Sequence, residues 1–394
     1  MSVKYSPHRL FFLGAGFSRP AGLPLANELL TRTMVELKPF GGFGLVSEAL
    51  SEYLDYLEET TGDPRPSLDQ INIESFIGYL DHEHFFGMLG SDTWSSEGNR
   101  PQLLLRWGIG RVLHKATPEP LPELYLRFAE RLQPRDVVVT FNYDMIVERA
   151  LEAVGKPYRR FPERYEEVRV THATGSPDVD SAEVVVSKVH GSIDWINQSK
   201  FLENFDYMLE SVGEKDAVRW RERDPIFGEQ PVSTCRPLIE GPRFKHDPLK
   251  KIGILDDLDA YYDSSDMWWR YAPMILAPSP AKQLYGDPFR ELWNGLPLYG
   301  QFWGGFSVVG YSLPDVDPYV KQALYRIGRS YVFGREHPEE RLGSMNRIKV
   351  VNRADAGTAQ DLYSRYRVLP TAHTDFLIDG FDESVLDALF DTGE

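Results

Sequence analysis

Short apolar runs alternate with longer amphipathic stretches along the chain. The runs that predict β-strands are residues 10–13, 136–144, 183–195, 273–279, 306–315 and 347–353. Helical patterns follow most of these runs, and the first one begins at Pro24 and continues to about Leu37. Strands that alternate with helices are typical of an open parallel sheet covered by helices. We therefore predict the α/β class, with a doubly wound, Rossmann-like parallel sheet.

Two long segments interrupt this alternation. Residues 45–132 have a mostly helical pattern, whereas residues 196–273 are rich in charge, proline and aromatic side chains and predict irregular structure. Residues 354–394 predict a short helical tail. We expect one domain over residues 1–394 that carries a helical insertion and an irregular insertion.

Charge and cysteine content exclude several classes of partner. The net charge of the 394 residues is −16, and the sequence has no run of Lys and Arg that would form a basic stripe, so we expect no direct binding of nucleic acid. A single cysteine, Cys235, cannot form an intrachain disulfide or a cysteine-rich zinc site, and we expect no metal. The sequence lacks a signal peptide and any apolar stretch of roughly 18 residues, which predicts a cytoplasmic protein without a membrane partner.

The first predicted strand ends in a glycine turn. In doubly wound sheets, ligands bind at the carboxyl ends of the strands, and the turn Gly14-Ala15-Gly16 would let a pyrophosphate approach the backbone. A dehydrogenase fingerprint has a third glycine where Arg19 stands, followed directly by a helix. Here the predicted helix begins only at Pro24, which disfavours a hydride-transferring dehydrogenase. A purely structural turn remains an alternative.

Polar side chains follow the other predicted strands. Asn142 and Asp144 place an amide and a carboxylate two residues apart, although Asp144 could equally cap the next helix. His190 offers an imidazole suited to proton exchange at neutral pH, although a lone histidine is more often structural. Ser312 and Asn352 could bind phosphate or ribose oxygens, or could simply form turns.

Taken together, these segments resemble the sirtuin superfamily, and most of all the bacterial sirtuin-like effectors of antiphage defence. The motifs are GAGFS (14–18), GLP (22–24), TFNYD (140–144), HGS (190–192), GYSLPDVD (310–317) and VVN (350–352). The resemblance implies that NAD is the substrate, with His190 as the catalytic histidine, Asn142 at the nicotinamide ribose and Asp144 near the nicotinamide amide. The residues that it places along the rest of NAD are Gly14, Ala15, Gly16, Ser18, Gly310, Ser312 and Asn352.

Two departures separate the chain from protein-deacylating sirtuins. Those enzymes usually carry four zinc-binding cysteines, and they place Asp-Phe-Arg after a Gly-Ile-Pro where this chain reads GLPLANEL. We therefore predict a NAD glycohydrolase that gives nicotinamide and ADP-ribose. An NAD-dependent deacylase and a non-catalytic binder of NAD or ADP-ribose are the alternatives. The resemblance further implies a homo-oligomer, with control by oligomerisation or by a partner such as a HerA-type ATPase or a short Argonaute.

Overall fold

The described residues divide into two compact units, each built around a sheet of its own. The computed structural model describes residues 8–88, 97–161, 182–239, 248–264, 267–276, 289–294, 303–314, 317–334, 347–355 and 357–390. Unit 1 combines residues 1–25, 117–189 and 292–394, and unit 2 combines residues 26–116 and 190–291. The chain therefore enters and leaves each unit more than once.

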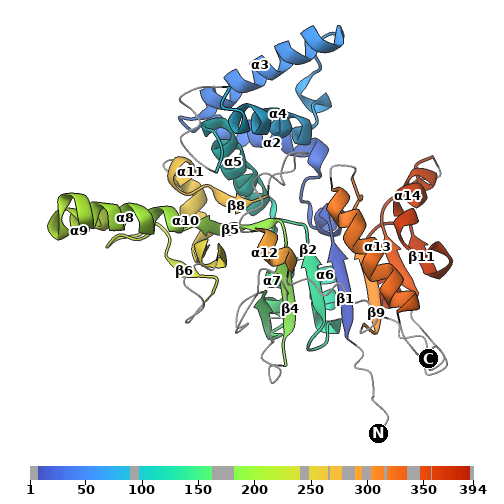
Figure 1. The fold of residues 1–394 in the computed structure, drawn as a ribbon. Helices are drawn as coiled ribbons and strands as arrows, with labels where there is room; N and C mark the ends of the chain where they lie inside the picture. The colour runs from blue at the N-terminus through green and yellow to red at the C-terminus, as the bar shows by residue number, and fades with distance from the viewer. Residues whose placement is uncertain are drawn as a thin grey trace. The chain divides into compact units, whose positions relative to one another are not determined.

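A seven-stranded parallel sheet forms the centre of unit 1 (Figure 1), in the order β11-β10-β9-β1-β2-β4-β3. The strands are β1 (Arg9–Leu13), β2 (Val137–Thr140), β3 (Tyr158–Arg160), β4 (Val184–Lys188), β9 (Gly305–Val309), β10 (Ile348–Val351) and β11 (Thr374–Leu377). The chain fills the sheet in opposite directions on the two sides of β1, so a topological switch point lies beside this strand. The predicted doubly wound α/β fold is confirmed.

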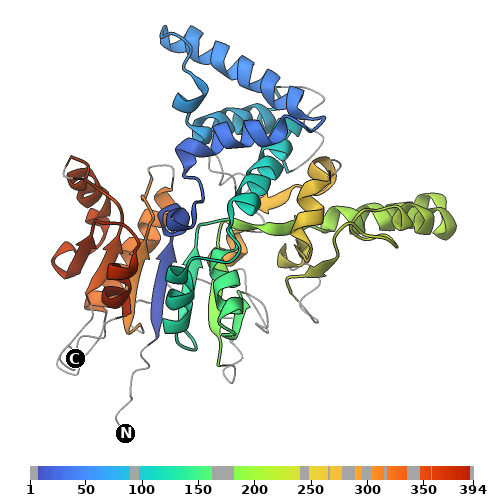
Figure 2. The ribbon, with the colours of Figure 1, turned by 180° about the vertical axis from the view of Figure 1, so that it is seen from behind.

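Helices cover both faces of this sheet. They are α1 (Ala15–Ser18), α6 (Glu123–Arg131), α7 (Ile146–Ala153), α13 (Pro318–Phe333), α14 (Ala359–Arg365) and α15 (Glu383–Phe390). Leu10 and Phe12 of β1 share a core with the buried side chains of α13. Phe11 points to the other face, where its ring centroid lies 5.6 Å from Phe128 of α6 and 5.4 Å from Phe390 of α15. Figure 1 is seen from the α13 side, and Figure 2 from the α6 side.

Unit 2 joins a group of helices to a smaller sheet. The sheet has the order β6-β7-β5-β8 with antiparallel pairs, formed by β5 (Gly191–Asn197), β6 (Cys235–Pro237), β7 (Ile252–Leu255) and β8 (Pro273–Ile275). The helices are α2 (Ala26–Leu37), α3 (Phe43–Thr61), α4 (Ile73–Phe85), α5 (Arg100–Ala116), α8 (Ser199–Val212), α9 (Glu214–Glu222), α10 (Leu258–Asp263) and α11 (Met267–Arg270). Tyr262 of α10 donates a hydrogen bond to the carbonyl of Ile193 in β5 at 2.6 Å, which ties the helices to the sheet. The residues of α12 (Phe289–Asn294) are divided between the two units.

The apolar run 183–195 is two strands in two different sheets, and the prediction of one continuous strand is wrong. β4 ends at Lys188 and β5 begins at Gly191, which has φ +86°. A Cβ at this position would lie 2.0 Å from the carbonyl oxygen of Met274, so only glycine fits there. The run that begins at Pro273 also joins the antiparallel sheet of unit 2, and not the parallel sheet.

Residues 196–273 and 354–394 both contain regular structure that the sequence analysis did not predict. Residues 196–273 include the helices α8 to α11 and the strands β6 and β7. The tail 354–394, expected to be helical, also supplies strand β11. Within the described ranges, no helix is long and apolar enough to span a membrane.

Candidate functional site

The turns after β1 and β9 lie against each other at the carboxyl edge of the parallel sheet. The amide of Gly14 donates to the carbonyl of Val309 at 3.0 Å, and the amide of Gly16 donates to the carbonyl of Gly310 at 2.7 Å. The amide of Gly310 in turn donates to Val351 at the end of β10, at 2.8 Å. Three strand ends are thus joined through their backbones.

Glycine is required where these turns meet. A Cβ on Gly14 would lie 2.6 Å from the Cα of Tyr311, and one on Gly16 would lie 2.8 Å from the Cα of Gly310. Gly310 itself has φ +67°, and its Cβ would lie 2.1 Å from the amide nitrogen of Phe17. The glycine motif therefore has a packing role, because two backbones approach each other more closely than side chains allow.

The prediction that the first helix starts only at Pro24 is wrong. α1 begins at Ala15, directly after Gly14, and continues into a 3₁₀ turn, η1 (Arg19–Ala21). Pro20 lies in the first positions of η1, where its missing N–H removes no helical hydrogen bond. The sequence analysis predicted no helix before Pro24, but residues 15–21 form a short helix followed by a tight turn.

Asn142, which follows β2, links the tip of that strand to the glycine turn. Its Nδ2 donates to the carbonyl oxygen of Gly14 at 2.9 Å and to the Oγ of Ser18 at 3.0 Å. The Ser18 hydroxyl in turn donates a hydrogen bond to Oδ2 of Asp144 at 2.7 Å. Both hydrogens of the carboxamide are therefore committed. Within the described residues its Oδ1 accepts no hydrogen bond, so this oxygen keeps its full capacity as an acceptor.

Asp144 lies just before α7 and receives this hydrogen-bond chain. Its Oδ1 accepts from the amide of Ile146, the first residue of α7, at 3.0 Å, although the N-cap residue of the helix is Met145. Burial raises the pKa of the Asp144 carboxyl, while Lys188, Ser18 and the Ile146 amide act in the opposite direction. The carboxylate is held by groups of the protein, and its Oδ2 reaches Asn142 only through Ser18.

A buried ion pair beneath Asp144 was missed by the sequence analysis. Lys188, the last residue of β4, places its Nζ 3.0 Å from Oε1 of Glu148 in α7, and their side chains are 0% and 1% exposed. The same ammonium donates to the main-chain carbonyl of Asp144. Buried charges are costly unless they are paired. The only indication of this ion pair in the sequence was a lysine at the end of an apolar strand.

Tyr125 of α6 was also missed. Its hydroxyl donates to the carbonyl of Phe17 at 2.8 Å and accepts from the amide of Ala21 at 3.0 Å. It thereby satisfies one backbone group of α1 and one of η1, and its own burial raises the pKa of the phenol. Nothing in its local sequence indicated this long-range contact.

The other residues of unit 1 that the sequence predicted are Asn352, Ala15 and Ser312. The carboxamide of Asn352 is bound by nearby backbone groups: its Nδ2 donates to the carbonyl of Tyr311 at 2.9 Å, and its Oδ1 accepts from the amide of Arg353 at 3.0 Å. Ala15 and Ser312 are exposed. The structure thus brings Gly14, Gly16, Ser18, Asn142, Asp144 and Gly310 into one contact network, with Asn352 at its β10 end.

His190 is the first residue of unit 2, one peptide bond beyond Val189 of unit 1. Its side chain is buried, and its carbonyl accepts from the amide of Leu276 at 2.7 Å. Val189 remains tied to the strand ends of unit 1, because its amide donates to the carbonyl of Thr140 at 3.2 Å. The approach of the His190 imidazole to Asn142 stays a prediction.

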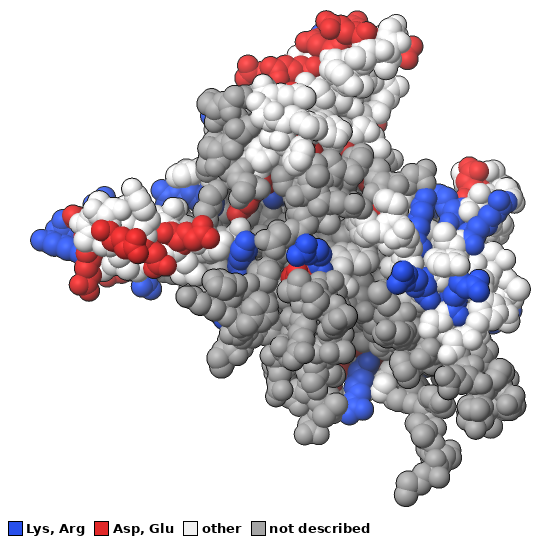
Figure 3. Space-filling view, viewed as in Figure 1, with Lys and Arg blue, Asp and Glu red and all other residues white. Residues whose placement is uncertain are grey.

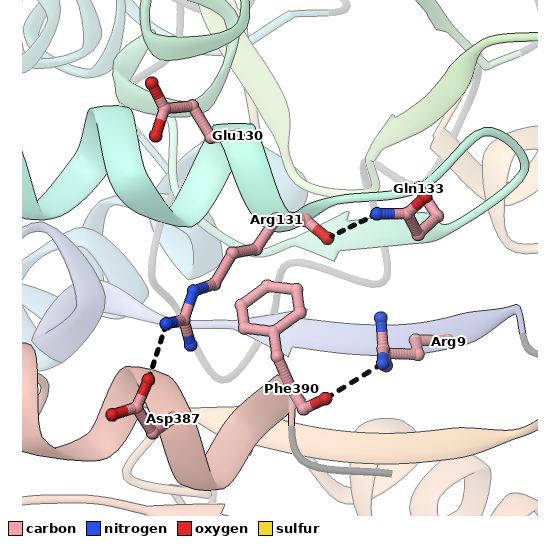
Figure 4. A pocket seen from close by; sticks show the side chains of 6 residues that line it. All are labelled: Arg9, Glu130, Arg131, Gln133, Asp387 and Phe390. Carbon is pink, nitrogen blue, oxygen red and sulfur yellow. Dashed lines mark hydrogen bonds and ion pairs between the residues drawn. The ribbon is translucent and has the colours of Figure 1, made fainter.

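A hollow of about 560 Å³ lies at the opposite edge of the parallel sheet (Figure 4). Its lining residues are Arg9, Glu130, Arg131, Gln133, Asp387 and Phe390. Arg9 opens β1, whereas the glycine turn follows the end of the same strand. The guanidinium groups are already engaged, since Arg131 pairs with Asp387 and Arg9 donates to the carbonyl of Phe390 at 2.9 Å. Ligands of doubly wound sheets bind at the carboxyl edge, so we place the candidate site there.

Two observations on the described parts concern metal ligands and the thiol. Over these residues, no group of three or more His, Cys, Asp or Glu side chains could hold a metal ion. Cys235 is a free, half-buried thiol in β6, and burial raises its pKa to about 12. Such a thiol is a poor nucleophile at neutral pH.

Comparison with known families adds an independent observation. Residues 136–225 match a family model described as a SIR2-like domain. The matched segment contains Asn142, Asp144, Lys188 and His190, and it begins just before β2. No curated protein sequence is significantly similar to the chain. The match supports a sirtuin-like family, and with it an NAD-related function.

Proposed function

We propose that this protein is a NAD glycohydrolase. Water would replace nicotinamide at the anomeric carbon of the nicotinamide ribose, which gives nicotinamide, ADP-ribose and one proton. The observation that carries the proposal is the network Ser18–Asn142–Asp144 at the carboxyl ends of β1 and β2. It lies beside the switch point of a doubly wound sheet, and two of its three residues fall in the segment that matches a SIR2-like domain.

The fixed carboxamide of Asn142 suits a role in orienting the ribose. Glycosidic cleavage passes through an oxocarbenium-like transition state, so the protein must hold the sugar and the attacking water in place. Because both Nδ2 hydrogens are bound by Gly14 and Ser18, the orientation of the amide is set and its Oδ1 acts as an acceptor. A ribose hydroxyl or the attacking water would donate to this oxygen.

Asp144 and the Lys188–Glu148 pair act as positioning residues in this proposal. Asp144 holds the Ser18 hydroxyl, which in turn holds Asn142, and Lys188 anchors the backbone of Asp144. Side chains held by buried hydrogen bonds are rigid, and rigid groups lose little entropy when the substrate binds. None of these three side chains needs to touch NAD.

His190 is proposed as the general base, a role implied by the resemblance to sirtuins. An imidazole that removes a proton from a ribose hydroxyl or from water contributes about 100- to 10,000-fold in rate. In the cell, this activity would deplete NAD as an antiphage defence response. We propose that a homo-oligomer or a partner protein controls it.

An assay with NAD as the only substrate separates the proposal from deacylation. The purified protein, with and without proteins that copurify with it, is incubated with NAD alone and with NAD plus an acetyl-lysine peptide. We expect nicotinamide and ADP-ribose in both reactions at the same rate. Nicotinamide that forms only with the peptide would identify a deacylase, and NAD binding without any product would identify a non-catalytic binder.

A further inference from the structure

The outer face of α13 in unit 1 carries aromatic and basic side chains. Tyr325, Arg329 and Phe333 follow one another at intervals of four residues, which places them on one side of the helix. Tyr325 is 48% exposed and Phe333 is 57% exposed. The guanidinium of Arg329 lies 5.7 Å from the ring centroid of Tyr325 and 5.5 Å from that of Phe333. Arg326 is also exposed, so this face has two guanidinium groups and two aromatic rings.

The end of α14 and the turn after it, η8 (Tyr366–Val368), bring two more arginines next to α13. Tyr366 is fully buried and shares the core of unit 1 with the buried side chains of α13. A Cβ on Gly328 of α13 would lie 2.8 Å from Cδ2 of Leu369, so this segment packs closely against the helix. Arg365 and Arg367, on either side of Tyr366, are exposed.

These two segments form a surface of one charge, which we call the basic patch. Its arginines are Arg326, Arg329, Arg365 and Arg367. Residues 318–334 and 362–374 contain no Asp or Glu, and Asp361 forms no ion pair with Arg365. Within the described residues, none of the four guanidinium groups is paired with a carboxylate. Figure 3 shows Lys and Arg side chains gathered over this part of unit 1, at the right of the view.

We infer that the basic patch binds single-stranded nucleic acid. Guanidinium groups bind phosphate oxygens through paired hydrogen bonds, and exposed aromatic rings provide faces on which unpaired bases stack. Tyr325 and Phe333 offer such rings next to the arginines. A strand that crosses α13 would place its phosphates on the basic patch and its bases on these two rings.

The chemistry of this surface favours nucleic acid over an acidic protein. Carboxylates would pair with the arginines but would leave the two exposed rings without a partner, whereas a nucleic-acid strand uses both kinds of group. Protein interfaces have an apolar core at their centre. No Leu, Ile, Val or Met side chain of α13 or η8 is exposed, so this surface offers no aliphatic core.

The net charge of −16 does not prevent this binding. Charges more than about 8 to 10 Å away are largely screened at physiological salt, so a strand responds mainly to the groups that it touches. We expected no direct binding of nucleic acid because the sequence has no run of Lys and Arg. The basic patch combines two segments that are far apart in the sequence, and no such run indicates it.

Fluorescence anisotropy with a labelled oligo(dT) strand of about 20 nucleotides tests the inference. The patch variant carries Arg326→Gln, Arg329→Gln, Arg365→Gln and Arg367→Gln. We expect its dissociation constant to be at least about tenfold higher than that of the wild type. For the wild type, the logarithm of the affinity should fall with the logarithm of the salt concentration with a slope of about −3, and the patch variant should lose most of this slope.

A second variant separates base stacking from charge. Tyr325→Ala with Phe333→Ala keeps all four arginines and should weaken the binding of oligo(dT) at least about fivefold, because the bases lose their stacking faces. A polyglutamate peptide of the same charge should bind the wild type more weakly than oligo(dT) does. Its affinity should be the same for this ring variant, since carboxylates contact only the arginines.

A matched control removes the same charge from α9 through Lys215→Gln, Arg219→Gln, Arg221→Gln and Arg223→Gln. It should bind oligo(dT) as the wild type does, and thermal melts should show that all variants are folded. The readout is oligonucleotide binding, so the inference does not depend on NAD cleavage.

Three results would overturn the inference. The first is a wild type that does not bind oligo(dT) at low salt. The second is unchanged affinity in the patch variant or in the ring variant, or an equal loss of affinity in the α9 control. The third is polyglutamate binding as tight as that of oligo(dT) and lost in the patch variant, which would identify an acidic protein as the partner.

Discussion

Asn142 holds the glycine turn in place, and this structural part of its role can be measured separately from catalysis. The change to alanine removes two buried hydrogen bonds, to Gly14 and Ser18, and leaves their partners unsatisfied. We expect Asn142→Ala to lower the free energy of unfolding by about 1 to 3 kcal/mol in urea denaturation. Ser18→Ala keeps the bond to Gly14 but removes two other buried hydrogen bonds, to Asn142 and Asp144, and should cost about as much. Equal stabilities for Asn142→Ala and the wild type would show that the network contributes nothing.

Gly310 combines a left-handed backbone with a lack of space, and Gly22 separates the two effects. Gly22 has φ +91°, but a Cβ there would meet nothing within 4 Å. We expect Gly22→Ala to cost about 1 kcal/mol through backbone strain alone. Gly310→Ala should cost several times more, because its Cβ would overlap the amide of Phe17. Thermal melts of the two variants compare these costs, and similar melting temperatures would contradict the close contact between the turns.

At the scale of elements, packing holds α15 to unit 1 more than its ion pairs do. Arg127 and Arg131 of α6 pair with Glu383 and Asp387 of α15, but these side chains are exposed. Exposed pairs contribute about 0 to 1 kcal/mol each. Leu386 is fully buried, so Leu386→Ala should destabilise unit 1 by about 2 to 5 kcal/mol, whereas Asp387→Ala should cost less than about 1 kcal/mol. The reverse order in urea denaturation would assign the docking to charge.

Asp136 gives the start of β2 a pH-dependent contribution to stability. It is fully buried and accepts hydrogen bonds from the amides of Arg9 at 2.7 Å and Gln133 at 2.8 Å, and burial raises its pKa to about 6 from 3.8. Between these values the folded protein keeps a proton that the unfolded chain has lost. This contribution is therefore largest below about pH 4 and is lost as the pH rises to about 6, by about 2 to 3 kcal/mol.

The variant Asp136→Asn isolates this effect. The difference in unfolding free energy between wild type and variant should change over about pH 4 to 6 and be constant above that range. Urea denaturation at a series of pH values gives this difference directly. Parallel stability profiles for the two proteins would mean that Asp136 has an ordinary pKa in the folded state.

The central strands could be predicted from the sequence because buried parallel strands are continuous apolar runs. The predictions for β1, β2, β9 and β10 lie within a few residues of the observed strands. β3 and β11 were missed, since their sequences, YRR and TDFL, are short and mixed in polarity. The break at Gly191 depends on contacts with Met274, far away in the sequence, and no local pattern shows it.

Part of the candidate site could also be predicted from the sequence. Polar residues after strand ends pointed to Asn142, which binds Gly14 directly, and to Asp144, which is linked to Asn142 through Ser18. Lys188, Glu148 and Tyr125 could not be predicted, because their roles come from partners on other elements. Periodicity reports which residues are buried, but it does not report which buried charges meet.

At the scale of the whole molecule, the residues to which we assign catalysis belong to two different units. Unit 1 holds the Asn142 network, and unit 2 begins with His190. The description of residues 1–394 as one domain stays a prediction.

Nicotinamide release from NAD tests the central claim most directly. We would compare the wild type, the double variant Asn142→Ala and His190→Ala, and Cys235→Ser, all in the same assembly state. The account predicts equal release by wild type and Cys235→Ser, and release at least about 100-fold slower by the folded double variant. Full activity in the double variant would contradict the assignment of NAD cleavage to these two residues.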